Sequence, residues 1–251
     1  MDRFVVGTGR CGSTLLSRML ALHPDAVSLF EVFNGLDVAR RFDPAPLSGA
    51  AMAELLGAEQ PFVTAVLRRG YPVAEIVYPF GEGGRHRPGD PLPWLLVATL
   101  PRLTGAPDRL FDGAMAFVRG RPVAPPAEHY RALFDWLAHV SGGAVWIVRS
   151  GSSLDYVAGL AETFPDARFV HLHRDGCEVA LSMREHHAYR LPISILYQAP
   201  LDTGEALADL GPLDLAAPPT GSDAISRILA STPPPEAFGR YWTDQVTRGM
   251  A

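Results

Sequence analysis

The sequence predicts an α/β protein with three layers, α/β/α, around a central parallel sheet. Short apolar runs of strand-forming residues occupy residues 3–7, 26–30, 144–148 and 168–173. Most of them lead through a polar loop into a segment with apolar residues at helical spacing. Repeated strand–loop–helix units imply parallel strands with right-handed crossovers. A chain of 251 residues with 47% hydrophobic residues can bury one full core, so we expect a single domain over residues 1–251.

The first strand–loop–helix unit has the form of an anion-binding loop. Residues 3–7 predict a strand, residues 12–23 predict its helix, and a glycine-rich turn joins them. Small polar residues, Ser13 and Thr14, fall in the first turn of the helix. This P-loop-like arrangement directs free backbone N–H groups and the positive end of a helix at an anion. We expect the helix to pack against the sheet through its apolar residues, Leu15, Leu16, Met19 and Leu20.

Residues 36–126 lack the strand–loop–helix rhythm and predict a helical insertion that covers or shapes a pocket. An exposed loop is expected at residues 79–93, which are rich in Gly, Pro and Arg. Short helices are expected at residues 36–42, 50–58, 62–69 and 95–103. Candidate walls of the pocket are the aromatic residues Tyr71, Trp94, Phe111 and Phe117.

The second half of the chain returns to strand–loop–helix units. An amphipathic helix at residues 127–140 precedes the strand 144–148. Residues 149–153 are expected to form a loop, in which Ser152 or Ser153 caps a helix that runs to Phe164. The strand 168–173 leads into a helix at residues 177–187. Order is expected to weaken over residues 199–222, and closing helices are expected at 222–230 and 235–250.

Three kinds of phosphate site share the pattern of the glycine turn. Gly7, Gly9 and Gly12 fit the dinucleotide fingerprint, and Glu31 follows at the expected distance after the second strand. The spacing also resembles a Walker A loop, but Ser13 stands where that loop needs its lysine. The third interpretation takes residues 10–14 as one unit, in which Arg10 reaches an oxyanion held by the backbone and by hydroxyl groups. The fourth interpretation is a strand–helix turn that binds no ligand.

A second anion site is indicated after the strand 168–173. Arg174 leaves the strand, and Ser182 follows eight residues later on the next helix. A guanidinium at the strand end and a hydroxyl two turns along the helix can share one phosphate. Taken alone, the pair also fits a surface salt-bridge partner and an exposed helical serine.

Composition limits the classes of function. The net charge of −5 and the pI of about 5.9 oppose general nucleic-acid binding. The sequence contains no lysine, so any phosphate clamp has to be built from arginine. Two cysteines, Cys11 and Cys177, supply neither a disulfide framework nor a metal-ligand set. The longest apolar run, residues 94–100, is too short to span a membrane, and we expect a cytoplasmic protein.

The motifs occur in the order seen in a known family. Residues 4–31 hold the glycine turn, and residues 144–187 hold Arg149 and the pair Arg174 and Ser182. This sequence resembles the PAPS-dependent sulfotransferases of the bacterial branch, which use 3′-phosphoadenosine 5′-phosphosulfate (PAPS). Their 5′-phosphosulfate loop has the pattern Lys/Arg-x-Gly-Thr/Ser-Thr, and their 3′-phosphate motif pairs an Arg with a Ser eight residues on. A dinucleotide fold does not predict the second site.

The resemblance implies a role for each matching residue. It assigns the 5′-phosphosulfate to the loop residues Gly9, Arg10, Cys11, Gly12, Ser13 and Thr14, and the 3′-phosphate to Arg174 and Ser182. Arg149 stands where the family has a lysine near the leaving oxygen. We therefore expect a sulfuryl transfer from PAPS to a hydroxyl or amine, with PAP as the product and no metal required. The expected catalytic residues are Glu31, Arg10 and Arg149.

Two departures from the family pattern keep alternatives open. Many eukaryotic members carry a histidine two residues after that lysine, but the position here is Gly151. Glu31 is therefore nominated as the general base, with Ser152, Ser153, His129, His171 and His173 in reserve. Family members also continue past the last expected helix, so an incomplete C-terminus is considered. The alternatives are a nucleotide-binding P-loop or NAD-type protein and a PAP-binding module without catalysis.

The resemblance does not narrow the class of acceptor molecule. A small molecule, a carbohydrate or a lipid can serve as the acceptor in this family. Nucleic acid and a membrane span are not expected, and a homodimer is considered.

Overall fold

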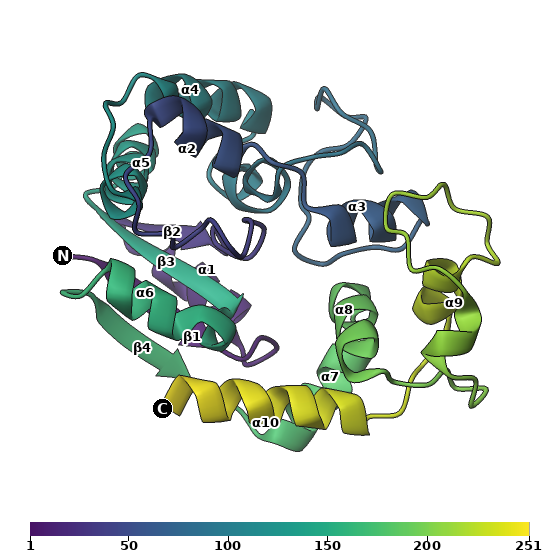
Figure 1. Ribbon diagram of the computed structural model, residues 1–251. Helices are drawn as coiled ribbons and strands as arrows, with labels where there is room; N and C mark the ends of the chain where they lie inside the picture. Colours follow the sequence, from purple (N-terminus) through teal and green to yellow (C-terminus); the bar gives the residue numbers. More distant parts are fainter. Residues whose placement is uncertain (251) are drawn as a thin grey trace.

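The computed structural model describes residues 1–250, and a parallel four-stranded sheet lies at its centre (Figure 1). The strands are β1 (Arg3–Gly7), β2 (Ala26–Phe30), β3 (Val145–Ser152) and β4 (Arg168–Leu172). Their spatial order is β2-β3-β1-β4, with parallel pairing throughout. Helices surround the sheet, which confirms the predicted α/β class with a P-loop-like first unit.

One face of the sheet carries the main hydrophobic core. Phe4 of β1 pairs in register with Val148 of β3 and Phe169 of β4, so these side chains point to the same face. The Phe4 ring lies 5.0 Å from the Phe164 ring and 6.1 Å from the Trp146 ring. Helices α5 (Pro126–Val140) and α6 (Val157–Thr163) cover this face and contribute buried side chains to the same core.

Helix α1 (Ser13–Leu20) packs on the opposite face through serines. Ser13 and Ser17 are buried, and the Ser17 hydroxyl lies 2.7 Å from that of Ser28 in β2. The expectation that Leu15, Leu16, Met19 and Leu20 face the sheet is wrong for Leu15 and Met19, which are 64% and 58% exposed, while Leu16 and Leu20 are partly buried. The small serine side chains let the helix axis lie close to the strands, and Ser13 is held there by Arg149.

The segment 36–126 is helical, with irregular connections. It contains α2 (Gly49–Leu56), α3 (Pro61–Arg68), the π-helix η1 (Leu95–Thr99), the 3₁₀-helix η2 (Leu100–Arg102) and α4 (Pro107–Arg119). The helix predicted at 36–42 is wrong. Asp37 instead accepts hydrogen bonds from the backbone N–H groups of Ala39 and Arg40, which favours a turn. Helix α4 was not predicted, although Pro107 stands at its first position.

Residues 149–152 differ from the expected loop, because β3 continues through them to Ser152. Ser153 does not cap a helix with its side chain. Its hydroxyl accepts a hydrogen bond from the Gly7 N–H at 3.0 Å and donates to the Ser150 carbonyl at 2.9 Å, at the start of the 3₁₀-helix η3 (Ser153–Tyr156). The tertiary contact with β1 thus prevails over local capping.

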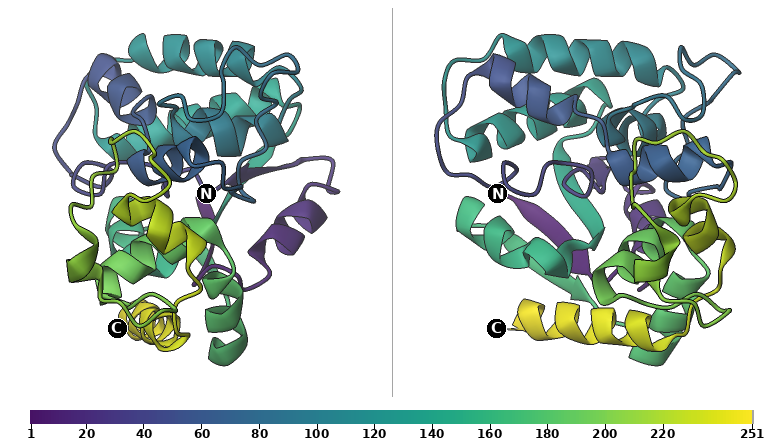
Figure 2. Two further views of the ribbon diagram at one scale, coloured as in Figure 1. Left: turned by 90° about the vertical axis from the view of Figure 1, so that its right-hand side faces the viewer. Right: turned by 45° about the vertical axis from the view of Figure 1, so that its right-hand side comes forward.

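The rest of the chain packs beside the carboxyl ends of the strands. The helix expected at 177–187 is α7 (Gly176–Arg184), which ends three residues before the expected bound. A further helix that was not predicted, α8 (His187–Tyr197), follows it and accommodates Pro192. Beyond the 3₁₀-helix η4 (Leu207–Leu210) follow the expected closing helices, α9 (Ala224–Ala230) and α10 (Glu236–Met250). Figure 2 shows α10, in yellow, on the side of the molecule opposite to α4.

Helices α2 and α4 of the segment 36–126 contribute buried residues to the core of the sheet. This shared core supports the prediction of one domain with a helical insertion, which stays a prediction. Within residues 1–250, no helix has the length and apolar character that crossing a membrane requires.

Candidate functional site

A polar cavity lies where the four strands end. Its volume is about 190 Å³, and charged, hydroxyl-bearing and glycine residues line it: Gly9, Arg10, Gly12, Ser13, Thr14, Glu31, Glu75, Arg149, Gly151, Arg174, Ser182 and Tyr189. Nine of the ten predicted site residues line this one cavity, and Cys11 does not. Ligands of open α/β sheets bind at this edge.

The glycine turn forms a backbone cradle beside the cavity. Gly9, Arg10 and Gly12 have φ angles of 81°, 51° and 90°. Within residues 1–250, the backbone N–H groups of residues 9–12 find no acceptor, so they are free for an anion. A Cβ atom at Gly9 would lie 2.0 Å from the Tyr189 hydroxyl oxygen. The Cys11 side chain is buried beside Gly7 instead.

The two predicted anion motifs meet at this loop. Arg10 donates from Nε to the Ser182 hydroxyl at 3.0 Å, and Arg174 donates from Nη1 to the Arg10 carbonyl at 3.0 Å. Arg174 also pairs with Glu178 at 2.8 Å, and both side chains are largely exposed. Residues more than 160 positions apart therefore form one cationic wall.

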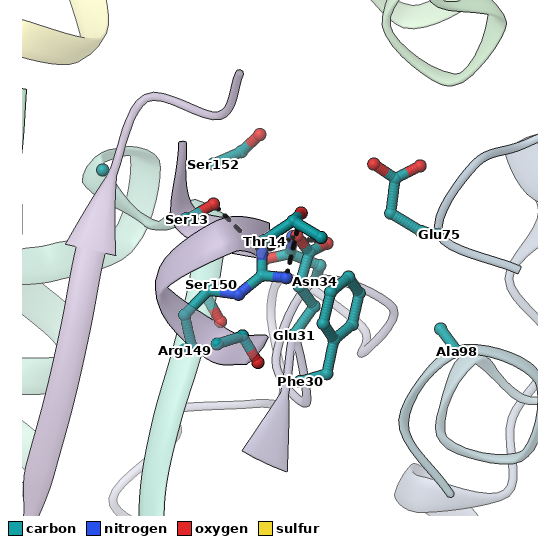
Figure 3. Close-up of polar contacts among 12 residues, drawn as sticks. Ser13, Thr14, Phe30, Glu31, Asn34, Glu75, Ala98, Arg149, Ser150 and Ser152 are labelled. Atoms are coloured by element: carbon teal, nitrogen blue, oxygen red, sulfur yellow. Dashed lines mark hydrogen bonds and ion pairs between the residues drawn. The ribbon is translucent and has the colours of Figure 1, made fainter. Parts of the chain in front are cut away.

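A buried ion pair closes the other wall of the cavity (Figure 3). Arg149 donates from Nη1 to Glu31 Oε1 at 2.7 Å and to the Ser13 hydroxyl at 3.1 Å, and from Nη2 to the Thr14 hydroxyl at 3.3 Å. The Asn34 amide donates to Glu31 Oε2 at 2.8 Å. Both carboxylate oxygens thus have a partner, and the guanidinium joins β3 to the glycine turn.

The backbone at Glu31 is held in an uncommon conformation. Its φ angle is 49°, in the left-handed region that non-glycine residues seldom adopt. The π-helix η1 and the residue before it fix this turn. The Trp94 indole donates to the Glu31 carbonyl at 2.8 Å, and the Thr99 hydroxyl donates to the Phe30 carbonyl at 2.7 Å. Such strain persists only where neighbouring contacts enforce it, and it is typical of functional sites.

Burial governs the protonation of the acidic groups. It raises the pKa of the Glu31 carboxyl, and the nearby Glu75 carboxylate adds to the rise, while Arg149 and Asn34 oppose it without reversing it. Burial, Glu31 and Glu75 together raise the pKa of Tyr189 well above its ordinary value. The Tyr189 hydroxyl, 2.9 Å from that of Ser152, therefore stays protonated.

Gly151 leaves the space that the Glu31 carboxylate uses. A Cβ atom at position 151 would lie 3.0 Å from Glu31 Oε1, closer than an ordinary contact. A histidine at this position would therefore crowd Glu31. The absence of the histidine is thus what allows the Glu31 carboxylate to occupy this place.

The reserve candidates for a base lie outside the cavity lining. His129 is buried in α5, with Nε2 2.9 Å from the Leu47 carbonyl. His171 lies in β4 and His173 directly after it, both are exposed, and the His173 ring neighbours Trp242. Ser152 contacts Tyr189, and Ser153 bonds to the backbone.

Sequence reasoning missed two cavity residues, Glu75 and Tyr189. Neither belongs to a recognisable motif, and only the fold brings them to the loop. The expected aromatic walls are wrong, because none of those side chains lines the cavity. Phe111 and Phe117 pack against the core, Tyr71 packs against a second cluster near α8, and Trp94 is buried behind Glu31.

The strand order separates this site from a dinucleotide fold. In that fold β2 lies beside β1 and carries the acidic residue to the ribose. Here β3 stands between β1 and β2, and Glu31 pairs with Arg149 of β3. In the part of the chain described, residues 1–250, no group of three or more His, Cys, Asp or Glu side chains could hold a metal ion.

Comparison with known proteins identifies one family. The model of the sulfotransferase family matches residues 119–204, which include Arg149, Arg174 and Ser182. The match confirms the resemblance to sulfotransferases over this segment, and the glycine turn and Glu31 lie outside it. No curated protein and no solved structure matches the chain.

Proposed function

We propose that this chain, a sulfotransferase-family protein over residues 119–204, transfers a sulfuryl group from PAPS to a hydroxyl or amine of a small-molecule acceptor. One observation carries the proposal. Two anion motifs more than 160 positions apart in the sequence converge on one cavity, and a buried carboxylate lies on its far wall.

The donor groups of the cavity suit a ligand with two phosphate-type ends. Among residues 1–250, three arginines, four hydroxyl-bearing residues and the free N–H groups of the loop line it. Open space lies beside Gly12, where a Cβ atom would meet nothing within 4 Å. Arg10, Gly12, Ser13 and Thr14 would hold the 5′-phosphosulfate, and Arg174 with Ser182 would hold the 3′-phosphate.

The roles of the residues follow from their charge and position. When bound, PAPS supplies a sulfuryl group whose bond from sulfur to the phosphate oxygen breaks as the acceptor oxygen bonds to sulfur. Glu31 accepts the proton that the acceptor hydroxyl loses. Arg10 and the loop N–H groups hold the charge of the sulfuryl oxygens, and Arg149 stabilises the electron pair on the leaving oxygen.

A PAP-binding module without catalysis is the second candidate, and one observation favours it. Both oxygens of Glu31 already accept hydrogen bonds, from Arg149 and from Asn34, so the carboxylate has to exchange a partner to take a proton. Binding of PAP without sulfuryl transfer to any acceptor would support this candidate.

Calorimetric titration with PAP tests the proposed donor site, with NAD and ATP–Mg as control ligands. We expect PAP to bind, and Arg174→Ala to weaken it about 10- to 100-fold, because a charge-assisted contact to phosphate is lost. Arg168→Ala is the matched control, since Arg168 is an exposed arginine in β4, the strand that precedes Arg174. Binding of NAD without PAP would contradict the proposal.

A further inference from the structure

Glu75 is a cavity residue that the proposed reaction does not use. It lies between α3 and η1, and its carboxylate lines the cavity together with Arg10, Glu31 and Tyr189. Its side chain is 13% exposed, and its Oε2 lies 3.0 Å from His186 Nε2. Figure 3 shows it standing apart from the Arg149–Glu31 pair, without a contact to it.

One residue, Arg102, contacts both the backbone of Glu75 and the residue before Glu31. Arg102 donates from Nη1 to the Glu75 carbonyl at 2.9 Å and to the Ala98 carbonyl at 2.7 Å. The Arg102 guanidinium lies 3.6 Å from the centre of the Phe30 ring, and Phe30 is the residue before Glu31. The two carboxylates are therefore held at set positions across the cavity.

The Glu75 carboxylate is charged and retains a free oxygen. Burial acts to raise its pKa, but the close contact with His186 and the charge of Arg10 hold the pKa below its ordinary value. His186 contacts Oε2, and within residues 1–250 no hydrogen bond to Oε1 is found. A charged acceptor oxygen is thus available at the cavity.

The lining favours a polar group at this position. Among residues 1–250, Tyr189 is the one aromatic residue of the lining, and no aliphatic hydrophobic side chain contributes. Because the cavity of about 190 Å³ also has to receive the sulfuryl end of PAPS, the acceptor group that enters it has to be compact. A buried carboxylate favours a ligand that offers a hydrogen-bond donor.

We propose that Glu75 selects the acceptor by binding a second hydroxyl or ammonium group next to the hydroxyl that faces Glu31. The acceptor is then a compact polar compound with two neighbouring hydrogen-bond donors, not an apolar phenol or a lipid alcohol. This inference rests on the proposed function, because it takes the acceptor to meet Glu31.

The test is calorimetric titration of the PAP-saturated protein with three acceptor probes. Methyl glucopyranoside offers neighbouring hydroxyls, glucosamine offers an ammonium beside a hydroxyl, and 4-methylphenol offers one hydroxyl on an apolar ring. We expect a sugar probe to bind more tightly than the phenol. Glu75→Gln should weaken that binding about tenfold or more, because the charged oxygen is lost.

Control variants separate this inference from the donor site. Glu82→Gln changes an exposed carboxylate of the same segment and should leave both affinities unchanged. PAP should bind Glu75→Gln with the wild-type affinity, which also reports an intact fold, and Glu75→Asp should recover part of the sugar affinity. With radiolabelled PAPS, the loss should appear in KM for the sugar more than in kcat.

Three results would overturn the inference alone. The first is tighter binding of the phenol than of both sugars, and the second is sugar binding that Glu75→Gln leaves unchanged. The third is the absence of sugar binding by the PAP-loaded wild type. Failure of PAP to bind the wild type would overturn the proposed function as well, and the first titration detects it.

Discussion

Glu31 and Arg149 form an ion pair whose side chains are 7% and 1% exposed. Removing two such charges from water costs several kcal/mol per ion, and their attraction and hydrogen bonds offset that cost only when the geometry is good. An apolar pair of similar volume often gives equal or greater stability. We therefore infer that the pair is kept for the chemistry of the cavity it faces.

Replacing Glu31 with Gln tests its role as the base. The amide can keep a hydrogen bond to Arg149 but cannot take up a proton at neutral pH. We expect kcat to fall about 10²- to 10⁴-fold, while the affinity for PAP stays near the wild-type value. Glu162→Gln is the matched control, because Glu162 is an exposed carboxylate on α6. Loss of PAP binding in Glu31→Gln would instead indicate a structural role.

The pH dependence of the reaction follows from the same carboxylate. A base has to be unprotonated, so kcat/KM should rise with pH through the pKa of Glu31. Because burial raises that pKa, the rise should lie above 4.5, the ordinary value of a glutamate. The Glu31→Gln variant should lack this limb of the profile. A wild-type limb that survives the substitution would assign the titration to another group.

At the scale of elements, sequence patterns predict strands better than the faces that helices bury. The four strand cores are predicted correctly, because their residues are apolar and short polar loops follow them. Residues 149–152 look like a loop, yet they are strand because their backbone pairs with the distant strands β1 and β2. For α1, hydrophobic spacing indicates the wrong face for Leu15 and Met19, since contacts of Ser13 and Ser17 with distant residues orient the helix.

The π-helix η1 and Trp94 support the turn that carries Glu31, and Trp94→Phe tests this support. The variant loses the indole donor to the Glu31 carbonyl, which then keeps the Asn34 backbone N–H at 3.2 Å as its donor. Loss of this one hydrogen bond should lower the free energy of unfolding by about 0.5–1.5 kcal/mol. It should also reduce kcat without changing the affinity for PAP, because the loop Arg10–Thr14 is untouched.

Trp136→Phe provides the comparison for this substitution. Trp136 stacks on Phe117 with ring centres 5.5 Å apart, and within residues 1–250 its indole N–H has no hydrogen bond. The Trp136→Phe variant should lose packing contacts but keep the wild-type kcat. Equal effects of both variants on kcat would show that Trp94 acts through general stability.

At the scale of the molecule, the strand order brings the two anion motifs together. Since β1 lies beside β4, the loops that follow them meet at one edge, and Arg174 reaches Arg10. Motif spacing predicts both loops but not Glu75 or Tyr189, because nothing local marks a residue that only long-range packing places. The residues of the site that belong to a loop motif can therefore be predicted from the sequence. Those that the segment 36–126 and α8 contribute cannot.

This convergence makes the stability of the whole fold depend on the ligand. A ligand that binds only the folded chain stabilises it by about 2.7 kcal/mol at 100 times its Kd. For a domain of this size, we expect PAP at that concentration to raise Tm by roughly 5–10 °C. Because PAP is expected to bridge the glycine turn and α7, Arg174→Ala should lose most of the shift at the same concentration, and NAD should cause none. A comparable Tm shift with NAD that Arg174→Ala retains would mean that the glycine turn binds a dinucleotide without the second motif. That result would contradict the prediction from the strand order, in which β3 lies between β1 and β2.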